Sequence, residues 1–404
     1  MISNLFPVWP LTIDPLAMVA LALLAATVVG ELFFRLLGLP RLTGYTLVGL
    51  ICGPSLLGWI GERELASMRL LIDLVLALLL FEIGVRVNLR WFRHNPLVLA
   101  TCFLESLLAF AAVFSVILYL GYSLEIALVV ATVSMATSPA AVMALTGQLK
   151  ARGQVTDRLL VITAFNVAFA ILIARVVMGY IHRSYGNDWL IAIFHPVYQL
   201  LGSLAVAYLL AKGFYLLRRY FDPAREQSSL MLFGLLMLTL ALLQALKLPA
   251  LLAPLLAGVV VKQTDPRPHV WPLHFGSVGG AMVILLFVMI GSSLNWKLFW
   301  LGGAAAFVLI LVRCGGKLLG VVLLGGASGL SIRQSLSLGA CLVPMSGVAF
   351  TLTDDIGQLF PAMNAELKTI VMSMIFVLEL LGPIILQRSL IWIGEAQTGE
   401  KNGT

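Results

Sequence analysis

The chain has 404 residues, of which 60% are hydrophobic and only 11% are charged, and its mean hydropathy is +1.02. This composition excludes a water-soluble globule and indicates an integral membrane protein with many spans. The net charge of +7 does not indicate nucleic acid binding, because the basic residues fall in short loops between apolar stretches. The cysteines stand singly in apolar segments, with no spacing typical of disulfides or metal sites. They are Cys52, Cys102, Cys314 and Cys341.

Apolar windows long enough to cross a bilayer predict about thirteen transmembrane helices. The first begins after Asp14 with no basic region before it, so we expect a retained span and not a cleaved signal peptide. Most Lys and Arg residues fall on one side when the loops alternate, which places the amino terminus outside and the carboxyl terminus in the cytoplasm. The predicted segments lie near residues 14–36, 42–60, 67–87, 96–120, 124–148, 156–181, 192–217, 227–246, 248–262, 274–295, 299–325, 333–357 and 367–392.

Two of these segments contain irregular stretches at membrane depth. The fifth holds SMATSPAAVMAL (residues 134–145) and the twelfth holds LVPMSGVAF (residues 342–350). A proline removes a helix hydrogen bond, and broken helices at matching places in a transporter mark a binding site, whereas either proline alone could be a simple kink. The matched pair favours two broken helices whose freed ends act on an ion. The residues concerned are Thr137, Ser138, Pro139, Pro344 and Ser346.

The chain also repeats itself. LPRLTGYTLVG (residues 39–49) recurs as LPALLAPLLAG (residues 248–258), an offset of about 209 residues. LLFEIG (residues 79–84) recurs as LLFVMIG (residues 285–291), at nearly the same offset. Because the shift spans an odd number of helices, the two copies should have opposite orientations, as in secondary transporters.

The repeats give the expected organisation of the chain. Two inverted six-helix repeats cover about residues 14–181 and 227–392, and a linking helix lies at 192–217. Together they form one transmembrane domain over residues 1–395. A short cytoplasmic tail is expected at 396–404.

In these features the chain resembles the monovalent cation:proton antiporters of the second group, which include Kef-type potassium efflux proteins and bacterial sodium/proton exchangers. The resemblance covers nearly the whole chain. It implies a sodium/hydrogen exchanger-like all-α fold, in which a core with crossed broken helices moves like an elevator past a dimer-forming scaffold. It also implies a homodimer in the lipid of the bacterial inner membrane, with no cofactor. The matching stretches are RLLGLPRLTGYTLVGLICGPSLLG, LLLFEIGVRVNL, ATSPAAV, RCGGKLLG and LELLGPIILQRSL.

Members of this family usually carry an aspartate in the sixth span that binds cation and proton in competition. Here the corresponding stretch is ITAFNVAFAIL, with Asn166 as its strongly polar residue, and Asn166 could match either position of the family's polar pair. An asparagine has no exchangeable proton near physiological pH. Its alternative role is a hydrogen bond between helices.

The eleventh span carries two basic residues on one helical face, Arg313 and Lys317. The resemblance implies that Lys317 faces the ion site and pairs with the aspartate of that site or with the broken helix, with Arg313 as its neighbour. A lysine buried in a membrane needs such a partner. Arg313 could instead extend to the membrane interface.

Acidic residues inside other spans could replace the missing aspartate. Asp73 also lies within a span, while Glu31 and Glu82 could simply pair with nearby loop arginines. Asp354 and Asp355 follow the second broken helix, where they could attract cations to an entrance, although we expect them at a solvated loop end. The possible substitute acids are Glu82, Glu105 and Glu379.

These observations favour a secondary transporter that exchanges a monovalent cation, Na⁺ or K⁺, for H⁺. The alternative is a divergent or non-transporting protein of the same fold, acting as a channel, a carrier of another solute or a partner subunit. An enzyme is not expected, because the five histidines lie in or near loops without an HExxH motif. No metal site is expected either.

Overall fold

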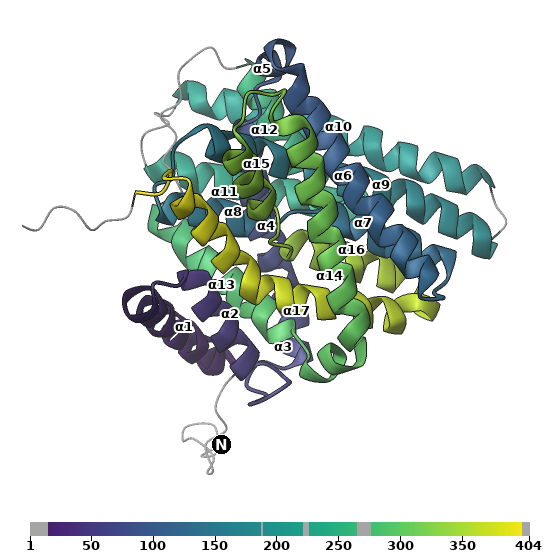
Figure 1. Cartoon of the computed structure of the whole chain (residues 1–404), viewed down its shortest axis with the longest axis horizontal. Coiled ribbons are helices and arrows are strands. Elements are labelled where there is room, and N and C mark those ends of the chain that lie inside the picture. Colours follow the sequence, from purple (N-terminus) through teal and green to yellow (C-terminus); the bar gives the residue numbers. More distant parts are fainter. Residues whose placement is uncertain (1–14, 187–188, 221–225, 265–275, 398–404) are drawn as a thin grey trace, which may run out of the picture.

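The computed structural model describes residues 15–186, 189–220, 226–264 and 276–397, which form helices and no strands (Figure 1). Each predicted apolar segment overlaps one helix or, in two places, a pair of half-helices. The predicted all-α membrane architecture is therefore confirmed. The start of the chain and most of the predicted tail at 396–404 lie outside the described residues.

Seven helical stretches among the described residues are long and apolar enough to cross a membrane. Six are single helices: α1 (Pro15–Leu37), α6 (Pro96–Tyr119), α9 (Gln154–Gly186), α10 (Trp189–Tyr220), α14 (Trp296–Gly325) and α17 (Pro361–Trp392). The seventh is divided into α7 (Leu124–Met135) and α8 (Pro139–Gln148). The other described helices are α2 (Arg41–Cys52), α3 (Glu62–Ser67), α4 (Arg69–Val85), α5 (Leu89–His94), α11 (Glu226–Ala245), α12 (Leu252–Thr264), α13 (Gly276–Ser293), α15 (Ile332–Cys341) and α16 (Gly347–Leu359).

One helix is much shorter than predicted. The segment expected at 42–60 ends at Cys52, and Gly53 is extended, with φ −71° and ψ 176°. Gly53 precedes Pro54, and a residue before proline is displaced from the helical region by the proline ring. The predicted length was wrong because an apolar window does not register this local stop.

Two pairs of helices approach so closely that glycine is required at the contact. A Cβ atom at Gly49 of α2 would lie 2.2 Å from the Val288 carbonyl oxygen of α13. A Cβ atom at Gly258 of α12 would lie 2.2 Å from the Phe81 carbonyl oxygen of α4. Gly49 and Gly258 are matching positions of the sequence repeat, and each touches a helix of the other repeat.

The reciprocal contacts follow the same pattern. A Cβ atom at Gly84 of α4 would lie 2.3 Å from the Leu255 carbonyl oxygen. One at Gly291 of α13 would lie 2.3 Å from the Thr46 carbonyl oxygen. Matching glycines thus support matching contacts, which is the arrangement that two related six-helix units would produce. Small residues at such contacts let helix backbones pack closely within a membrane.

The helices pack in two groups. The core group contains α6 to α9 and α14 to α17, and the scaffold group contains α1, α2, α4 and α10 to α13. The groups touch mainly where α9 meets α10, α17 meets α2 and α4 meets α8. In Figure 1, α1, α2 and α13 lie at the lower left, away from α6, α7 and α9.

A cluster of ion pairs also joins the groups. Arg69 of α4 pairs with Asp354 and, at 2.6 Å, with Asp355, both on α16. Arg175 of α9 lies 3.5 Å from Asp355, and Lys368 of α17 lies 3.3 Å from Asp354. The prediction of a solvated loop end for the two aspartates was wrong, because α16 continues to Leu359 and both carboxylates are paired.

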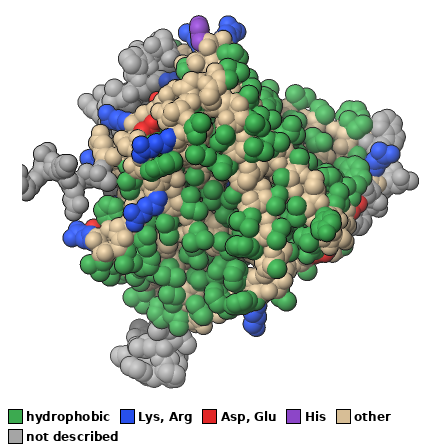
Figure 2. Space-filling view, in the orientation of Figure 1, with side chains coloured by type: hydrophobic (Ala, Val, Ile, Leu, Met, Phe, Trp, Pro, Cys, Tyr) green, Lys and Arg blue, Asp and Glu red, His purple; other side chains and the backbone are tan. Residues whose placement is uncertain are grey.

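The surface suits a lipid environment. Figure 2 shows hydrophobic side chains over most of one face, with charged side chains mainly near its edges. Large apolar side chains of α1 are strongly exposed, among them Leu24 at 66% and Leu36 at 75%. In water this exposure would be unfavourable, whereas against lipid tails it is not.

The close backbone contacts predict opposite effects for the same substitution at two glycines. Gly84→Ala should destabilise the protein by about 1–3 kcal/mol, because the new methyl group meets backbone that cannot rotate away. Gly234→Ala in α11 has open space around its Cβ and should stabilise by up to about 1 kcal/mol through helix propensity. Thermal unfolding in detergent measures both changes, and equal effects would contradict the proposed packing.

Candidate ion-translocation site

The two broken helices meet at their interruptions. The chain leaves the helical conformation between Met135 and Pro139 and again between Cys341 and Gly347. The amide of Ser138 donates a hydrogen bond of 2.9 Å to the carbonyl of Pro344. Each break therefore satisfies backbone groups freed by the other, which lipid could not do.

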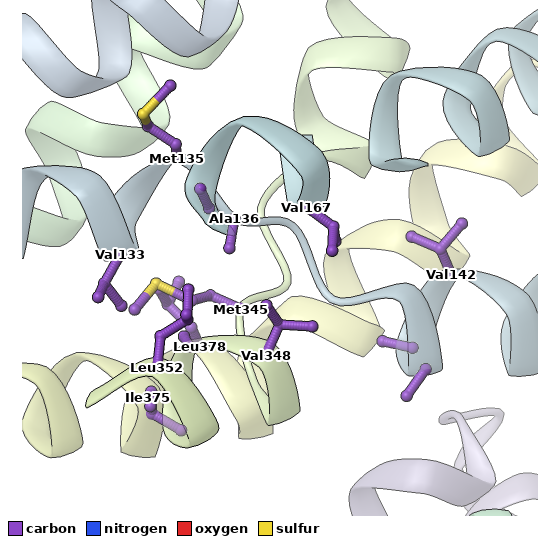
Figure 3. Packing of buried hydrophobic residues seen from close by; sticks show 14 of the residues in the cluster. Val133, Met135, Ala136, Val142, Val167, Met345, Val348, Leu352, Ile375 and Leu378 are labelled. Atoms are coloured by element: carbon purple, nitrogen blue, oxygen red, sulfur yellow. The ribbon is translucent and has the colours of Figure 1, made fainter. Parts of the chain in front are cut away.

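Apolar side chains surround this meeting point. Figure 3 shows Val133 and Ala136 at the first break, Met345 and Val348 at the second, and Leu378 of α17 among them. All five are at most 2% exposed. The polar groups of the breaks are thus held in a dry environment, where electrostatic interactions are stronger than in water.

Arg313 of α14 holds the ends of two half-helices together. Its guanidinium donates hydrogen bonds to the carbonyls of Ser134 at 2.9 Å, Ala136 at 2.8 Å and Val343 at 2.8 Å. These carbonyls lie at the carboxyl ends of α7 and α15, which have unpaired oxygens and partial negative charge. The side chain is 0% exposed. Extension of Arg313 to the membrane interface is therefore excluded.

Lys317 lies one turn further along α14. Its Nζ atom is 3.0 Å from Glu105 Oε2 and donates to the Met135 carbonyl at 2.9 Å. Both charged side chains are 0% exposed. Gly320 allows this approach of α14 to α6, since a Cβ atom there would lie 2.3 Å from the Glu105 Cα. The expected position of Lys317 beside the broken fifth span is confirmed, and the partner is Glu105.

Asn166 joins this ion pair to the first break. Its Oδ1 atom is 2.9 Å from the hydroxyl of Ser106, and its Nδ2 donates to Thr137 Oγ1 at 2.9 Å. The hydroxyl of Thr137 is in turn 3.4 Å from the Leu342 carbonyl of the second break. The neighbouring Val167 belongs to the apolar cluster. Asn166 is therefore the polar residue of α9 at this site.

Ser106 is a member of the network that sequence reasoning missed. Its hydroxyl lies 2.9 Å from Asn166 Oδ1 and 3.1 Å from Glu105 Oε1. The Ser106 hydroxyl thus links the Lys317–Glu105 pair to Asn166.

The second break has its own polar group. The hydroxyls of Ser138 and Ser346 are 2.6 Å apart, and Ser346 interacts with the carboxyl of Glu379 on α17. Gly382 packs on the same break, since a Cβ atom there would lie 2.8 Å from the Pro344 Cα. Glu82 of α4, by contrast, is not part of the site. Its carboxylate lies 3.2 Å from the guanidinium of Arg86, which follows the last residue of α4.

The buried ion pair predicts strong coupling between two substitutions. Lys317→Met and Glu105→Gln should each destabilise the protein by about 3–5 kcal/mol, because each leaves a charge without its partner. The double variant should cost clearly less than the sum of the single effects. Thermal or denaturant unfolding in detergent measures this cycle, and simple additivity would mean that the pair contributes no mutual stabilisation.

Comparison with known proteins agrees with this arrangement. The sodium/hydrogen exchanger transmembrane family model matches residues 19–392. The chain is 23% identical over 343 residues to the Na(+)/H(+)-K(+) antiporter GerN of Bacillus cereus, covering 83% of this chain and 86% of that protein. Its fold is similar to that of the sodium proton antiporter MjNhaP1 of Methanocaldococcus jannaschii, with a TM-score of 0.68, 17% identity and coverage of 94% of this chain and 95% of that chain. Since the family match spans almost all of the sequence, the chain belongs to the sodium/hydrogen exchanger family of cation:proton antiporters.

Proposed function

We propose that the protein exchanges a monovalent cation, Na⁺ or K⁺, for H⁺ across a membrane. The observation that carries this proposal is the Lys317–Glu105 pair, fully buried at the junction of the two broken helices. An ionisable pair at this depth is costly, and it is retained in membrane proteins mainly where it moves ions or protons. Its position beside the Met135 carbonyl gives a cation carboxylate and carbonyl oxygens as ligands.

The exchange follows from the charge at this pair. When a cation binds to the Glu105 carboxylate, it displaces the Lys317 ammonium, and a second positive charge in the dry site is unfavourable. Release of one proton from the pair offsets the bound cation, so the charge of the site stays constant. Cation and proton therefore compete although Asn166 carries no charge. In this proposal Glu105 has the role that an aspartate in the sixth span usually has.

Two cavities between the groups would give access to the site. One, of about 490 Å³, is lined by Asp73 of α4, Ser292 of α13 and Phe350 of α16. The other, of about 330 Å³, is lined by Glu82 of α4 and Met143 of α8. Each cavity thus reaches the half-helix that follows one of the two breaks. Movement of the core group along the scaffold group would open them in turn, as an elevator mechanism requires.

A homodimer would suit this movement, because the scaffold group would be held still by its copy. The positive-inside distribution further supports an inner-membrane protein with its carboxyl terminus in the cytoplasm. The alternative, a divergent protein without coupled exchange, is favoured by one observation. Both ends of the Asn166 amide are already hydrogen-bonded within the protein.

Reconstituted vesicles test the proposal directly. An imposed Na⁺ or K⁺ gradient should drive proton movement by the parent protein. Glu105→Gln should lower the rate about tenfold or more, a barrier change of at least about 1.4 kcal/mol. Glu366→Gln, which removes an exposed acid of α17, should have no effect. Proton flux that does not depend on the cation gradient would overturn the antiport function.

A second substitution tests the missing aspartate. Asn166→Asp should increase pH-dependent exchange, because it adds a titratable carboxyl within reach of Ser106 and Thr137. Asn295→Asp is the matched control, since an aspartate can cap α14 as Asn295 does. Measurement of initial rates over a range of pH compares the three proteins. If Asn166→Asp and Asn295→Asp behave alike, Asn166 has no place in the exchange.

A further inference from the structure

We propose that Glu379 is a second exchange carboxyl, which holds a proton in the empty protein and a monovalent cation after that proton leaves. The inference rests on the proposed antiport function and adds a binding group to it. Glu379 lies on α17, at the amino-terminal ends of α8 and α16, whereas the Lys317–Glu105 pair lies at the carboxyl-terminal end of α7.

The first argument is an oxygen atom without a partner. Glu379 is 2% exposed, and its Oε1 atom is buried with no hydrogen-bond donor. Among the described residues, no Lys, Arg or His lies within ion-pair distance of it. A buried acceptor left unfilled costs about 1–3 kcal/mol, or more when charged. Such an atom is open to a proton or to a ligand.

The second argument is the position of two hydroxyl groups between the breaks and Glu379. The hydroxyls of Ser138 and Ser346 are 2.6 Å apart, and Ser138 also accepts a hydrogen bond of 3.2 Å from the Ala141 amide. Ser346 in turn interacts with the carboxyl of Glu379. The two serines thus lead to the carboxyl, whereas its Oε1 atom has no donor and is open to a proton or a cation.

The third argument is that the two basic side chains at the breaks are already bonded to other groups. Arg313 donates hydrogen bonds to the carbonyls at the ends of α7 and α15. Lys317 donates hydrogen bonds to Glu105 Oε2 and to the Met135 carbonyl. In the described part of the chain, Glu379 is thus the carboxyl at the breaks that has no positive partner. A cation could bind to the Glu379 carboxylate without first displacing a lysine side chain from it.

The environment also suits a carboxyl that changes its charge. Ser138 and Ser346 precede the first turns of α8 and α16, where the partial positive charge of a helix stabilises a carboxylate. The ligands offered to a cation are oxygens, namely the carboxylate and the two serine hydroxyls, as hard monovalent cations prefer. The step is balanced: the Glu379 O–H bond breaks, the proton leaves, and the cation takes its place. The net charge of the site does not change.

Proton release on cation binding tests the proposal without requiring transport. The purified full-length protein is placed in detergent with little buffer, Na⁺ or K⁺ is added, and released protons are counted with an indicator dye against a choline control. The parent should release protons, and Glu379→Gln should release about one fewer per chain, because one titratable carboxyl is gone. Glu366→Gln, on the same helix but exposed, should match the parent.

Two further measurements keep the test decisive. Glu379→Asp retains a carboxyl on a shorter side chain, so it should retain proton release with weaker apparent cation affinity, even if Glu379→Gln folds poorly. The infrared band of a protonated carboxyl should decrease when cation binds to the parent, and this decrease should be smaller in Glu379→Gln. Equal proton release by the parent and a folded Glu379→Gln variant, or no release by the parent, overturns the proposal.

The two proposals fail in different ways. If vesicles show cation-driven proton flux but Glu379→Gln leaves both the flux and its pH profile unchanged, antiport stands and the second carboxyl is wrong. If proton release depends on Glu379 but no ion crosses the vesicle membrane, the binding site stands and antiport is wrong.

Discussion

The structure depends on one constraint: backbone groups freed inside a membrane must be satisfied by the protein itself. Both breaks meet this requirement together. Arg313 donates to carbonyls from each of them, and the Ser138 amide donates to the Pro344 carbonyl. The guanidinium is suited to this task because its donors form a rigid fork that reaches several oxygens at once. Without it, the carboxyl ends of two half-helices would face one another with like partial charges.

The same constraint explains the division between the two sets of charged residues. Positive side chains occupy the carboxyl-terminal ends of the half-helices, and Glu379 lies near the amino-terminal ends. The two basic side chains thus have the sign opposite to that of the nearby helix ends, and so would Glu379 once it has lost its proton. Asn166 belongs to neither set, and it connects Ser106, beside the Lys317–Glu105 pair, to Thr137 at the first break. A neutral amide suits a position that must both accept and donate a hydrogen bond.

The sequence predicted the all-α membrane fold and the two interruptions, because Pro139 and Pro344 signal a break locally. The family resemblance implied that Lys317 faces this site, and its Nζ atom does bond to the Met135 carbonyl at the first break. The partner of Lys317 could not be chosen from sequence. Glu105 and Glu379 are both acids in apolar helices, and only the register of α6 against α14 separates them. Ser106 was missed for the same reason, since its role depends on the facing helix.

The ion pairs of Arg69 with Asp354 and Asp355 join the scaffold group to the core group beside the larger cavity. All three side chains are partly exposed, so dissolved salt weakens their attraction. In the elevator movement proposed above, these contacts would break in one direction and form again in the other. The ionic strength of the adjacent solution would then change the free-energy difference between the two positions of the core group.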